Sequence, residues 1–164
     1  MSRSRRHRNL VAWTLVLTQG VLLVALAVWP VPQRATSWLP VNLAGVGLSA
    51  LGLGVVVVGS TQLGSSLTAS PVPKDVGVLR DSGLYAVTRH PLYSGLLLFA
   101  VGRVLSHPSF AAAGLALGLL LLLWAKASWE ERMLRQKFPQ YAAYALRVPR
   151  FVPRPSLWRA SRSP

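Results

Sequence analysis

Four long apolar runs dominate this 164-residue chain and limit what it can fold into. They cover about residues 10–29, 39–59, 90–105 and 109–126. A helix needs about 20 apolar residues to cross a hydrocarbon core about 30 Å thick, and the first two runs reach that length. The third run is short for a span unless the preceding residues or a snorkelling Arg103 extend it. We therefore predict an all-α integral membrane protein with about four transmembrane helices.

The connections and small residues indicate how these helices pack. Only residues 106–108 separate the third run from the fourth, so we predict a tight helical hairpin there. Small residues let helices approach closely in lipid, and Gly45, Gly47, Gly52 and Gly54 lie inside the second run, which ends at Gly59. We interpret the second run as a packed span.

The basic residues predict the orientation in the membrane. Sixteen of the eighteen Lys and Arg lie before the first run, between the second and third, or after the fourth. The positive-inside rule then places both termini and the middle loop in the cytoplasm. Fifteen Arg against three Lys is a bias that we associate with GC-rich bacterial genomes, so we expect the bacterial inner membrane. An alternative is that the first run is a secretory signal, with Ala25 and Ala27 at its cleavage site.

Composition excludes several classes of function. The formal charge of +14 invites a nucleic-acid interpretation. The basic residues follow the topology rule, however, and are not interleaved with aromatic residues as a stacking platform requires, so we expect no nucleic-acid partner. With no Cys, the chain has no disulfide, no thiolate nucleophile and no Cys-ligated metal. Three His and four acidic residues make us expect no metal site either.

Polar side chains gather in the loop 75–95 and after the fourth run. Pro91 suits the first turn of a helix, which would place His90 at the N-cap. Free backbone N–H groups there, together with Arg89 and His90, favour an anion such as a carboxylate. The alternative is that this basic pair only anchors the topology.

Two adjacent acids, Glu130 and Glu131, follow the fourth run, and such a pair repels itself unless a cation lies nearby. One interpretation is that Lys126 and Arg135 form ordinary i, i+4 pairs with them. The other is that Glu130 faces a pocket shared with the loop and meets the ammonium, hydroxyl or sulfonium group of a ligand.

Residues 128–153 are predicted to form a cytoplasmic amphipathic helical segment, which Pro139 divides into two pieces that fold back over the loop. Tyr141 and Tyr144 fall on one face of it, where interfacial anchoring is the alternative to a role in the site. Residues 154–164 form a basic tail, and we interpret residues 1–164 as a single domain.

Two motifs occur in order along the chain. Residues 83–95 read Gly-Leu-Tyr-x3-Arg-His-Pro-x-Tyr-x-Gly, and residues 130–153 read Glu-Glu-x2-Leu-x3-Phe-x2-Tyr-x2-Tyr-x2-Arg-x2-Arg-x2-Pro. Together they resemble the isoprenylcysteine carboxyl methyltransferase family and, more widely, the small membrane methyltransferases that include phospholipid methyltransferases. The resemblance covers about residues 75–153, whereas the first two runs match only in being apolar.

This resemblance implies S-adenosylmethionine in a cytoplasmic-side pocket and a lipophilic acceptor, either a membrane lipid or a prenylated molecule, that arrives from the bilayer. Carried over residue by residue, it implies ten cofactor contacts, namely Gly77, Val78, Leu79, Arg80, Tyr85, His90, Pro91, Leu92, Tyr93 and Glu130. Glu130 and Lys126 are the implied catalytic residues, and Lys126 is also the implied substrate contact.

The chain departs from the family pattern at two places. The family usually has an Arg where this chain has Lys126, so the charge is kept but the bidentate fork is lost. The Gly-Thr-Gln of many eukaryotic members is absent, since Gly102 is followed by Arg103 and Val104, which weakens the inference to a prenylated protein as acceptor.

Methyl transfer from a sulfonium needs alignment in a dry site more than acid–base groups. A carboxylate acceptor needs no base, whereas an ammonium acceptor must lose a proton to one of few groups, Glu130, Glu131 or His90. We therefore favour carboxylate O-methylation. The alternative, to which Lys126 points, is a non-catalytic scaffold or partner subunit that keeps the methyltransferase fold.

Overall fold

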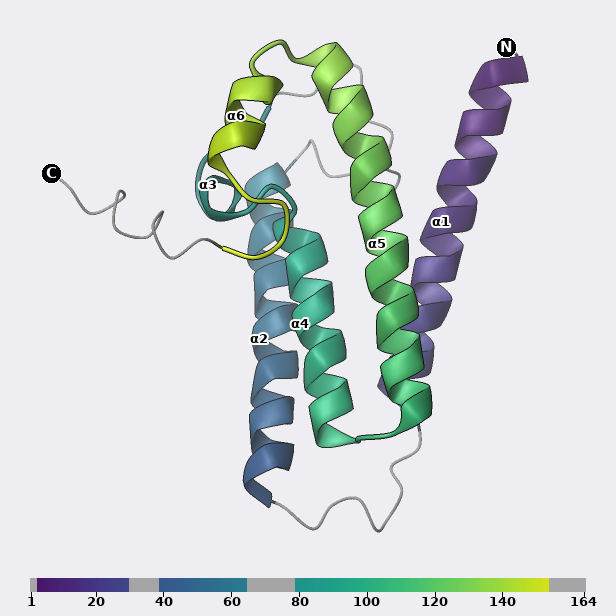
Figure 1. Cartoon of the computed structure of the whole chain (residues 1–164), viewed down its shortest axis with the longest axis vertical. Helices are drawn as coiled ribbons and strands as arrows, with labels where there is room; N and C mark the ends of the chain where they lie inside the picture. The colour runs from purple at the N-terminus through teal and green to yellow at the C-terminus, as the bar shows by residue number, and fades with distance from the viewer. Residues whose placement is uncertain (1–2, 30–38, 65–78, 154–164) are drawn as a thin grey trace, which may run out of the picture.

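The computed structural model describes residues 3–29, 39–64 and 79–153, and within these ranges the chain forms helices and no strand. Four long helices run alternately along the molecule: α1 (Arg3–Val28), α2 (Leu39–Leu63), α4 (Pro91–Ser106) and α5 (Phe110–Lys137) (Figure 1). Two short helices, α3 (Leu84–Val87) and α6 (Tyr141–Arg147), lie at the end where α1 begins and α5 ends (Figure 1). We call this end the site end. The prediction of an all-α fold is confirmed.

Three of the long helices are long and apolar enough to cross a membrane: Asn9–Val28, Leu39–Leu63 and Phe110–Lys137. Their outer faces carry exposed large apolar side chains such as Leu17, Val57 and Leu121, as lipid-facing surfaces do. The chain is therefore an integral membrane protein. The fourth predicted span, α4, is apolar but has 16 residues. At 1.5 Å per residue it is about 24 Å long, shorter than a typical hydrocarbon core.

Helices α2 and α4 are packed backbone to backbone. A Cβ atom added to Gly52 would lie 2.5 Å from the carbonyl oxygen of Gly95, and one added to Gly102 would lie 2.5 Å from the carbonyl oxygen of Gly45. Each pair is one heptad from the next along its helix, so the glycines form two contact points on one seam. This close approach is what small residues allow between helices in lipid.

The predicted glycine interface was right for two positions of the four. Gly45 and Gly52 lie in the seam, whereas Gly47 and Gly54 have no atom within 4 Å of an added Cβ and lie on the outer face of α2. The next seam position is Gly59, where an added Cβ would lie 2.9 Å from Leu92. The seven-residue spacing of 45, 52 and 59 marks the buried face, and Gly47 and Gly54 fall outside that repeat.

Helix α5 packs against α1 and α4 around buried Leu26, Ala100, Leu119 and Leu123. The predicted hairpin between α4 and α5 is confirmed, since α4 ends at Ser106 and α5 begins at Phe110. Its second helix is capped, because the Ser109 hydroxyl accepts a hydrogen bond from the backbone N–H of Ala112 at 3.1 Å.

Arg103 does not extend α4 by snorkelling. Its guanidinium donates to the backbone carbonyl of Leu26 at 3.0 Å and to that of Ala27 at 3.2 Å. These are among the last carbonyls of α1, which have no partner within their own helix. Arg103 therefore caps the C-terminus of α1 and ties it to α4.

Helix α5 differs from the predicted boundary between a span ending at 126 and a separate helix beginning at 128. It runs unbroken from Phe110 to Lys137. Charged residues replace leucines beyond residue 125, yet no helix-breaking residue occurs before Pro139, so the backbone continues. The predicted break at Pro139 is confirmed, and α6 starts two residues later.

Candidate active site

The loop that precedes α4 is fixed to the end of α2. Gly83 has a φ of 62°, a left-handed conformation that glycine adopts without strain, and it leads directly into α3. The backbone N–H of Leu84 donates to the side-chain carbonyl of Gln62 at 2.8 Å. The buried hydroxyl of Tyr85 donates to the carbonyl of Gly59 at 3.4 Å. Burial and the charge on Glu130 raise the pKa of Tyr85 to about 12, so this hydroxyl remains a donor at neutral pH.

The C-terminal segment after α6 folds back onto this loop, as the sequence predicted. The backbone N–H of Arg89 donates to the carbonyl of Pro149 at 2.9 Å, and that of His90 donates to Arg150 at 3.2 Å. The Thr88 hydroxyl donates to the same Arg150 carbonyl at 2.7 Å. These bonds join segments about 60 residues apart in sequence.

The predicted start of α4 is confirmed, with His90 at the N-cap and Pro91 in the first turn. The basic pair at this helix start, Arg89 and His90, binds a carboxylate of the chain itself, that of Glu131. Arg89 donates to Glu131 Oε1 through Nε at 3.2 Å and through Nη2 at 3.1 Å. Arg89 Nη1 also donates to the carbonyls of Ala145 and Val148. Arg89 is thus occupied by structural contacts.

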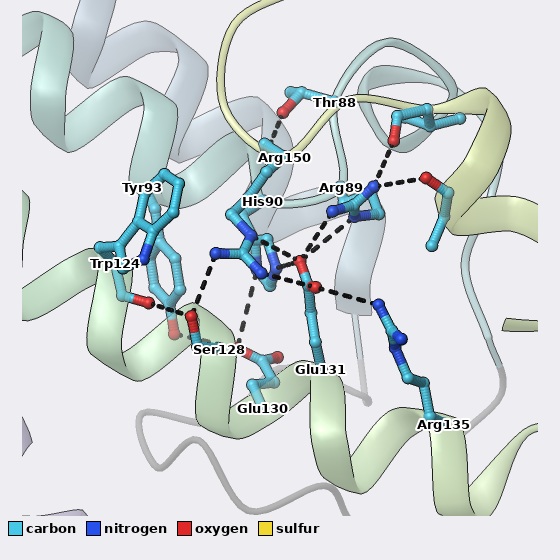
Figure 2. Close-up of polar contacts among 12 residues, drawn as sticks. Thr88, Arg89, His90, Tyr93, Trp124, Ser128, Glu130, Glu131, Arg135 and Arg150 are labelled. Atoms are coloured by element: carbon cyan, nitrogen blue, oxygen red, sulfur yellow. Dashed lines mark hydrogen bonds and ion pairs between the residues drawn. The ribbon is translucent and has the colours of Figure 1, made fainter. Parts of the chain in front are cut away.

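Glu131 is the centre of a buried ion cluster (Figure 2). Besides Arg89, it accepts hydrogen bonds from His90 Nε2 at 3.1 Å and from Arg150, through Nε at 3.0 Å and Nη2 at 2.9 Å. Only 3% of its side chain is exposed. The i, i+4 contact with Arg135 exists but is longer, at 4.0 Å. Glu131 therefore holds α5, α4 and the C-terminal segment together.

Glu130, the preceding residue, has a different environment. Its side chain is 29% exposed, and its Oε2 accepts a hydrogen bond from the Tyr93 hydroxyl at 3.0 Å (Figure 2). His90 Nδ1 lies 3.8 Å from the same oxygen. Within the described part of the chain, Oε1 of Glu130 has no hydrogen-bond partner. This carboxylate keeps an oxygen available for a ligand.

Aromatic rings surround these acids. The rings of His90 and Tyr93 are stacked, with centroids 5.2 Å apart and planes at 4°. Phe151 packs near His90 and Trp124, with ring centroids 6.0 Å away in both cases. Arg150 lies over the Trp124 ring at 4.7 Å. Such a lining lowers the local polarity and strengthens electrostatic contacts inside it.

Lys126 lies one turn before Glu130 and is buried, with 3% exposure. Its ammonium donates to Gln19 Oε1 of α1 at 2.6 Å and lies 5.5 Å from the centroid of the Tyr93 ring. The simple i, i+4 ion pair with Glu130 that we considered does not form in this structure, since the described ion pairs of Glu130 include no lysine.

Only some of the remaining predicted cofactor contacts lie near Glu130 and Lys126. Leu79 packs against the cluster of Tyr141, Tyr144 and Val148, and Arg80 is exposed. Leu92 points toward Gly59 of α2, and Pro91 is fully buried beside it. Gly77 and Val78 lie outside the described residues, as does the tail 154–164. The structure thus brings Tyr85, His90, Tyr93, Lys126 and Glu130 together.

Tyr141 and Tyr144 are buried, with 1% and 3% exposure, so neither is an interfacial anchor in this structure. The Tyr144 hydroxyl donates to the backbone carbonyl of Tyr85 at 2.6 Å, which fixes α6 against α3. The Tyr141 hydroxyl is buried and has no partner in the described part of the chain. Burial raises the pKa of both phenols.

Sequence reasoning missed three residues that build this site. The sequence predicts Glu131 only as half of an acid pair and as one of three candidate proton acceptors, although an acid among basic residues at i+4 and in the loop is a signal of an ion cluster. Arg150 belongs to the C-terminal motif but was given no role. Gln19 is the only carboxamide in the first apolar run, and a polar residue inside a span marks a contact between helices.

The family model for phospholipid methyltransferase matches residues 41–141. The chain belongs to the phospholipid methyltransferase family. This match begins in α2 and ends at the first residue of α6, so it contains Lys126, the acid pair and the Arg-His-Pro turn.

Individual relatives fall into two groups by name. A cobalt-zinc-cadmium resistance protein of Cupriavidus metallidurans is 34% identical over 155 residues, which cover 94% of this chain and 67% of that protein. A nickel-cobalt-cadmium resistance protein of Alcaligenes xylosoxydans xylosoxydans is 33% identical over 156 residues, covering 94% and 68%. A protein-S-isoprenylcysteine O-methyltransferase of Arabidopsis thaliana is 38% identical over 77 residues, covering 46% of this chain and 39% of that enzyme. The resemblance noted from the two motifs is confirmed.

Proposed function

We propose that this protein transfers a methyl group from S-adenosylmethionine to a lipophilic acceptor at the cytoplasmic face of the membrane, with a carboxylate oxygen as the favoured position. Membership of a methyltransferase family supports the reaction type. The observation that carries the proposal is the difference between two adjacent acids. Glu131 is fully engaged by Arg89, His90 and Arg150, whereas Glu130 is part-exposed and keeps a free oxygen.

The residues around Glu130 suit the chemistry of this cofactor. S-adenosylmethionine supplies, when bound, a methyl group on a positively charged sulfur, together with an ammonium, a carboxylate and ribose hydroxyls. The free oxygen of Glu130 binds a cation or a hydroxyl donor. Arg80 has no described contact with Glu130, but it is exposed on the loop before α3, and we assign its guanidinium to the carboxylate of the cofactor. The His90 and Tyr93 rings offer an apolar surface to a sulfonium or a base.

The chain contributes position more than acid–base chemistry. Tyr93 contacts both the proposed cofactor residue and the proposed acceptor residue. Its hydroxyl binds Glu130, and its ring lies beside Lys126. Lys126 is therefore the residue that binds the polar end of the acceptor, next to the cofactor. A carboxylate oxygen would bond to the methyl carbon as the carbon–sulfur bond breaks and leaves neutral S-adenosylhomocysteine. It would lose no proton first, so alignment and exclusion of water carry the rate.

Cofactor binding tests this assignment directly. We expect the purified protein in lipid nanodiscs to bind S-adenosylmethionine in calorimetry, and Glu130→Ala to weaken that binding at least about 10-fold, as loss of a charge-assisted hydrogen bond in a dry site does. Gln136→Ala, at an exposed position of the same helix, is the control and should bind like the parent. If Glu130→Ala binds as well as the parent with an unchanged melting temperature, the site assignment is wrong.

The second candidate is a non-catalytic scaffold, and the engagement of Lys126 by Gln19 favours it, since that contact occupies the proposed substrate lysine. The names of two relatives suggest metal tolerance as the setting for either role. A host lacking the gene separates the two candidates. Methyl transfer predicts that the parent, but not Glu130→Ala, labels a membrane lipid from methyl-labelled cofactor and restores growth on cobalt or cadmium. A scaffold predicts equal growth with both and no labelled lipid.

A further inference from the structure

The described contacts of Lys126 do not use all of its hydrogen-bond donors. Lys126 is almost fully buried in a long apolar helix, where an uncompensated charge is costly and usually functional. Its described partners, the Gln19 carbonyl oxygen and the Tyr93 ring, are both neutral. The charge of Glu130 acts on it from one turn away, beyond ion-pair distance. A lysine ammonium has three N–H donors, and the Gln19 oxygen and the Tyr93 ring are its described contacts, so at least one N–H has no described partner.

Gln19 also has unused donors. A lysine can only donate, so the side-chain oxygen of Gln19 must face Lys126 and its NH2 group must point elsewhere. Among the described residues, Gln19 makes no other hydrogen bond. Two neighbouring groups, one on α1 and one on α5, therefore each keep at least one free N–H donor, and they are joined by a bond of 2.6 Å.

We infer that Gln19 and Lys126 together form a two-donor site for the carboxylate of the acceptor. A carboxylate is best held by two parallel N–H donors, as a single guanidinium provides, and a lysine alone does not provide them. Here the amide of Gln19 supplies the second donor and Lys126 supplies the charge. The inference rests on the proposed function, which already favours a carboxylate acceptor, and adds Gln19 of α1 as a residue that recognises that carboxylate.

The position of the pair supports this role. Tyr93 lies between Lys126 and Glu130, so the two-donor site and the proposed cofactor contact share one side chain. Gln19 lies on α1, before the stretch that the family model matches. The first helix thus takes part in acceptor recognition, in addition to anchoring the protein in the membrane.

The test measures binding of three farnesyl thioethers that differ only at the end, which is a carboxylate, its methyl ester or a phosphate monoester. The protein is held in nanodiscs of zwitterionic phosphatidylcholine. We expect the parent to bind the acid at least about 10-fold more tightly than the ester, since of these two only the acid carries a negative charge to pair with Lys126. Gln19→Glu keeps an acceptor for Lys126 but replaces the donor with an anion, and it should lose this preference.

A pair of further variants distinguishes recognition from loss of folding. Gln19→Leu should lose most of the preference for the acid, and Gln19→Leu combined with Lys126→Arg should regain it, because a guanidinium supplies both donors alone. Thr18→Leu, at an exposed position on α1, is the control and should behave like the parent.

Three outcomes would overturn the inference: an unchanged preference in Gln19→Glu, tighter binding of the phosphate than of the acid, or no binding of any probe to the parent. Binding of S-adenosylmethionine is measured in the same samples. If the parent and Gln19→Glu both bind the cofactor, the proposed function survives the failure of this inference. If neither binds it, the proposed function fails as well.

Discussion

Glu130 and Glu131 have the same side chain but opposite environments because successive residues on a helix point about 100° apart. Glu131 points toward the Arg-His-Pro turn and the C-terminal segment, where cations compensate its burial. Glu130 points toward Tyr93 on the face of α5 that also carries Lys126. Glu131 is therefore engaged in contacts that stabilise the fold, whereas Glu130 keeps one oxygen without a described partner.

Glu131→Gln should destabilise the protein strongly. The change leaves Arg89 and Arg150 close together without their shared counter-charge, and breaking a buried ion cluster from one side costs about 3–5 kcal/mol. Glu130→Gln, the matched control, should cost less than about 1 kcal/mol, since it alters one part-exposed hydrogen bond. Thermal unfolding in detergent measures both. Equal losses of stability in Glu131→Gln and Glu130→Gln would contradict a structural role for Glu131 that Glu130 does not share.

Tyr144 and Tyr141 offer a second matched comparison at the residue scale. Tyr144→Phe removes the donor for the buried carbonyl of Tyr85, which should cost about 1–3 kcal/mol. Tyr141→Phe removes a buried hydroxyl that has no described partner, so the free energy of unfolding should stay constant or rise. Chemical denaturation of both variants, compared at equal cosolvent composition, checks the order. A larger loss in Tyr141→Phe would show that its hydroxyl has a partner.

At the scale of elements, the seam between α2 and α4 predicts position-specific effects of adding one methyl group. Gly52→Ala places a Cβ against the backbone of Gly95 and Phe99, which cannot move aside as a side chain can, and should cost at least about 2 kcal/mol. Gly54→Ala faces open space on the same helix and should be neutral or stabilise by up to about 1 kcal/mol. Melting temperatures in one detergent compare the two. Similar values would exclude close backbone packing at Gly52.

The sequence predicted those elements whose ends are set by local chemistry. Pro91 starts α4 and Pro139 ends α5, and each of these residues acts within a few positions of itself. The sequence predicted less where the outcome depends on a distant partner. Which glycines of α2 face α4, and whether Lys126 meets Glu130 or Gln19, depend on how helices far apart in sequence are rotated against each other.

The same distinction between local chemistry and distant partners explains which parts of the candidate site the sequence predicted. The Arg-His-Pro turn and the acid pair were found because each is a short motif. The difference in environment between Glu130 and Glu131 depends on Arg150, which reaches α5 only after the chain turns back through α6. A helical periodicity places the two acids on different faces, but it does not indicate which face will be covered.

At the scale of the whole molecule, the alternating helices place the start of α1, α3, α6 and the end of α5 together (Figure 1). Exposed Arg132, Arg135 and Arg147 lie at or near this site end. At the opposite end, Arg103 is engaged by the carbonyls of α1. Basic residues favour the cytoplasmic side, so this arrangement supports a cytoplasmic site end.

Labelling of single cysteines tests this orientation cleanly, because the chain has none of its own. Gln140→Cys lies exposed at the site end, and Pro108→Cys lies exposed in the hairpin at the other end. With a membrane-impermeant maleimide on intact cells, Pro108→Cys should react and Gln140→Cys should react only after permeabilisation. The opposite pattern would place Glu130 and Lys126 on the side away from the cytoplasm, where S-adenosylmethionine is made. Methyl transfer at this site would then have no supply of cofactor, so the orientation is a condition of the proposed function.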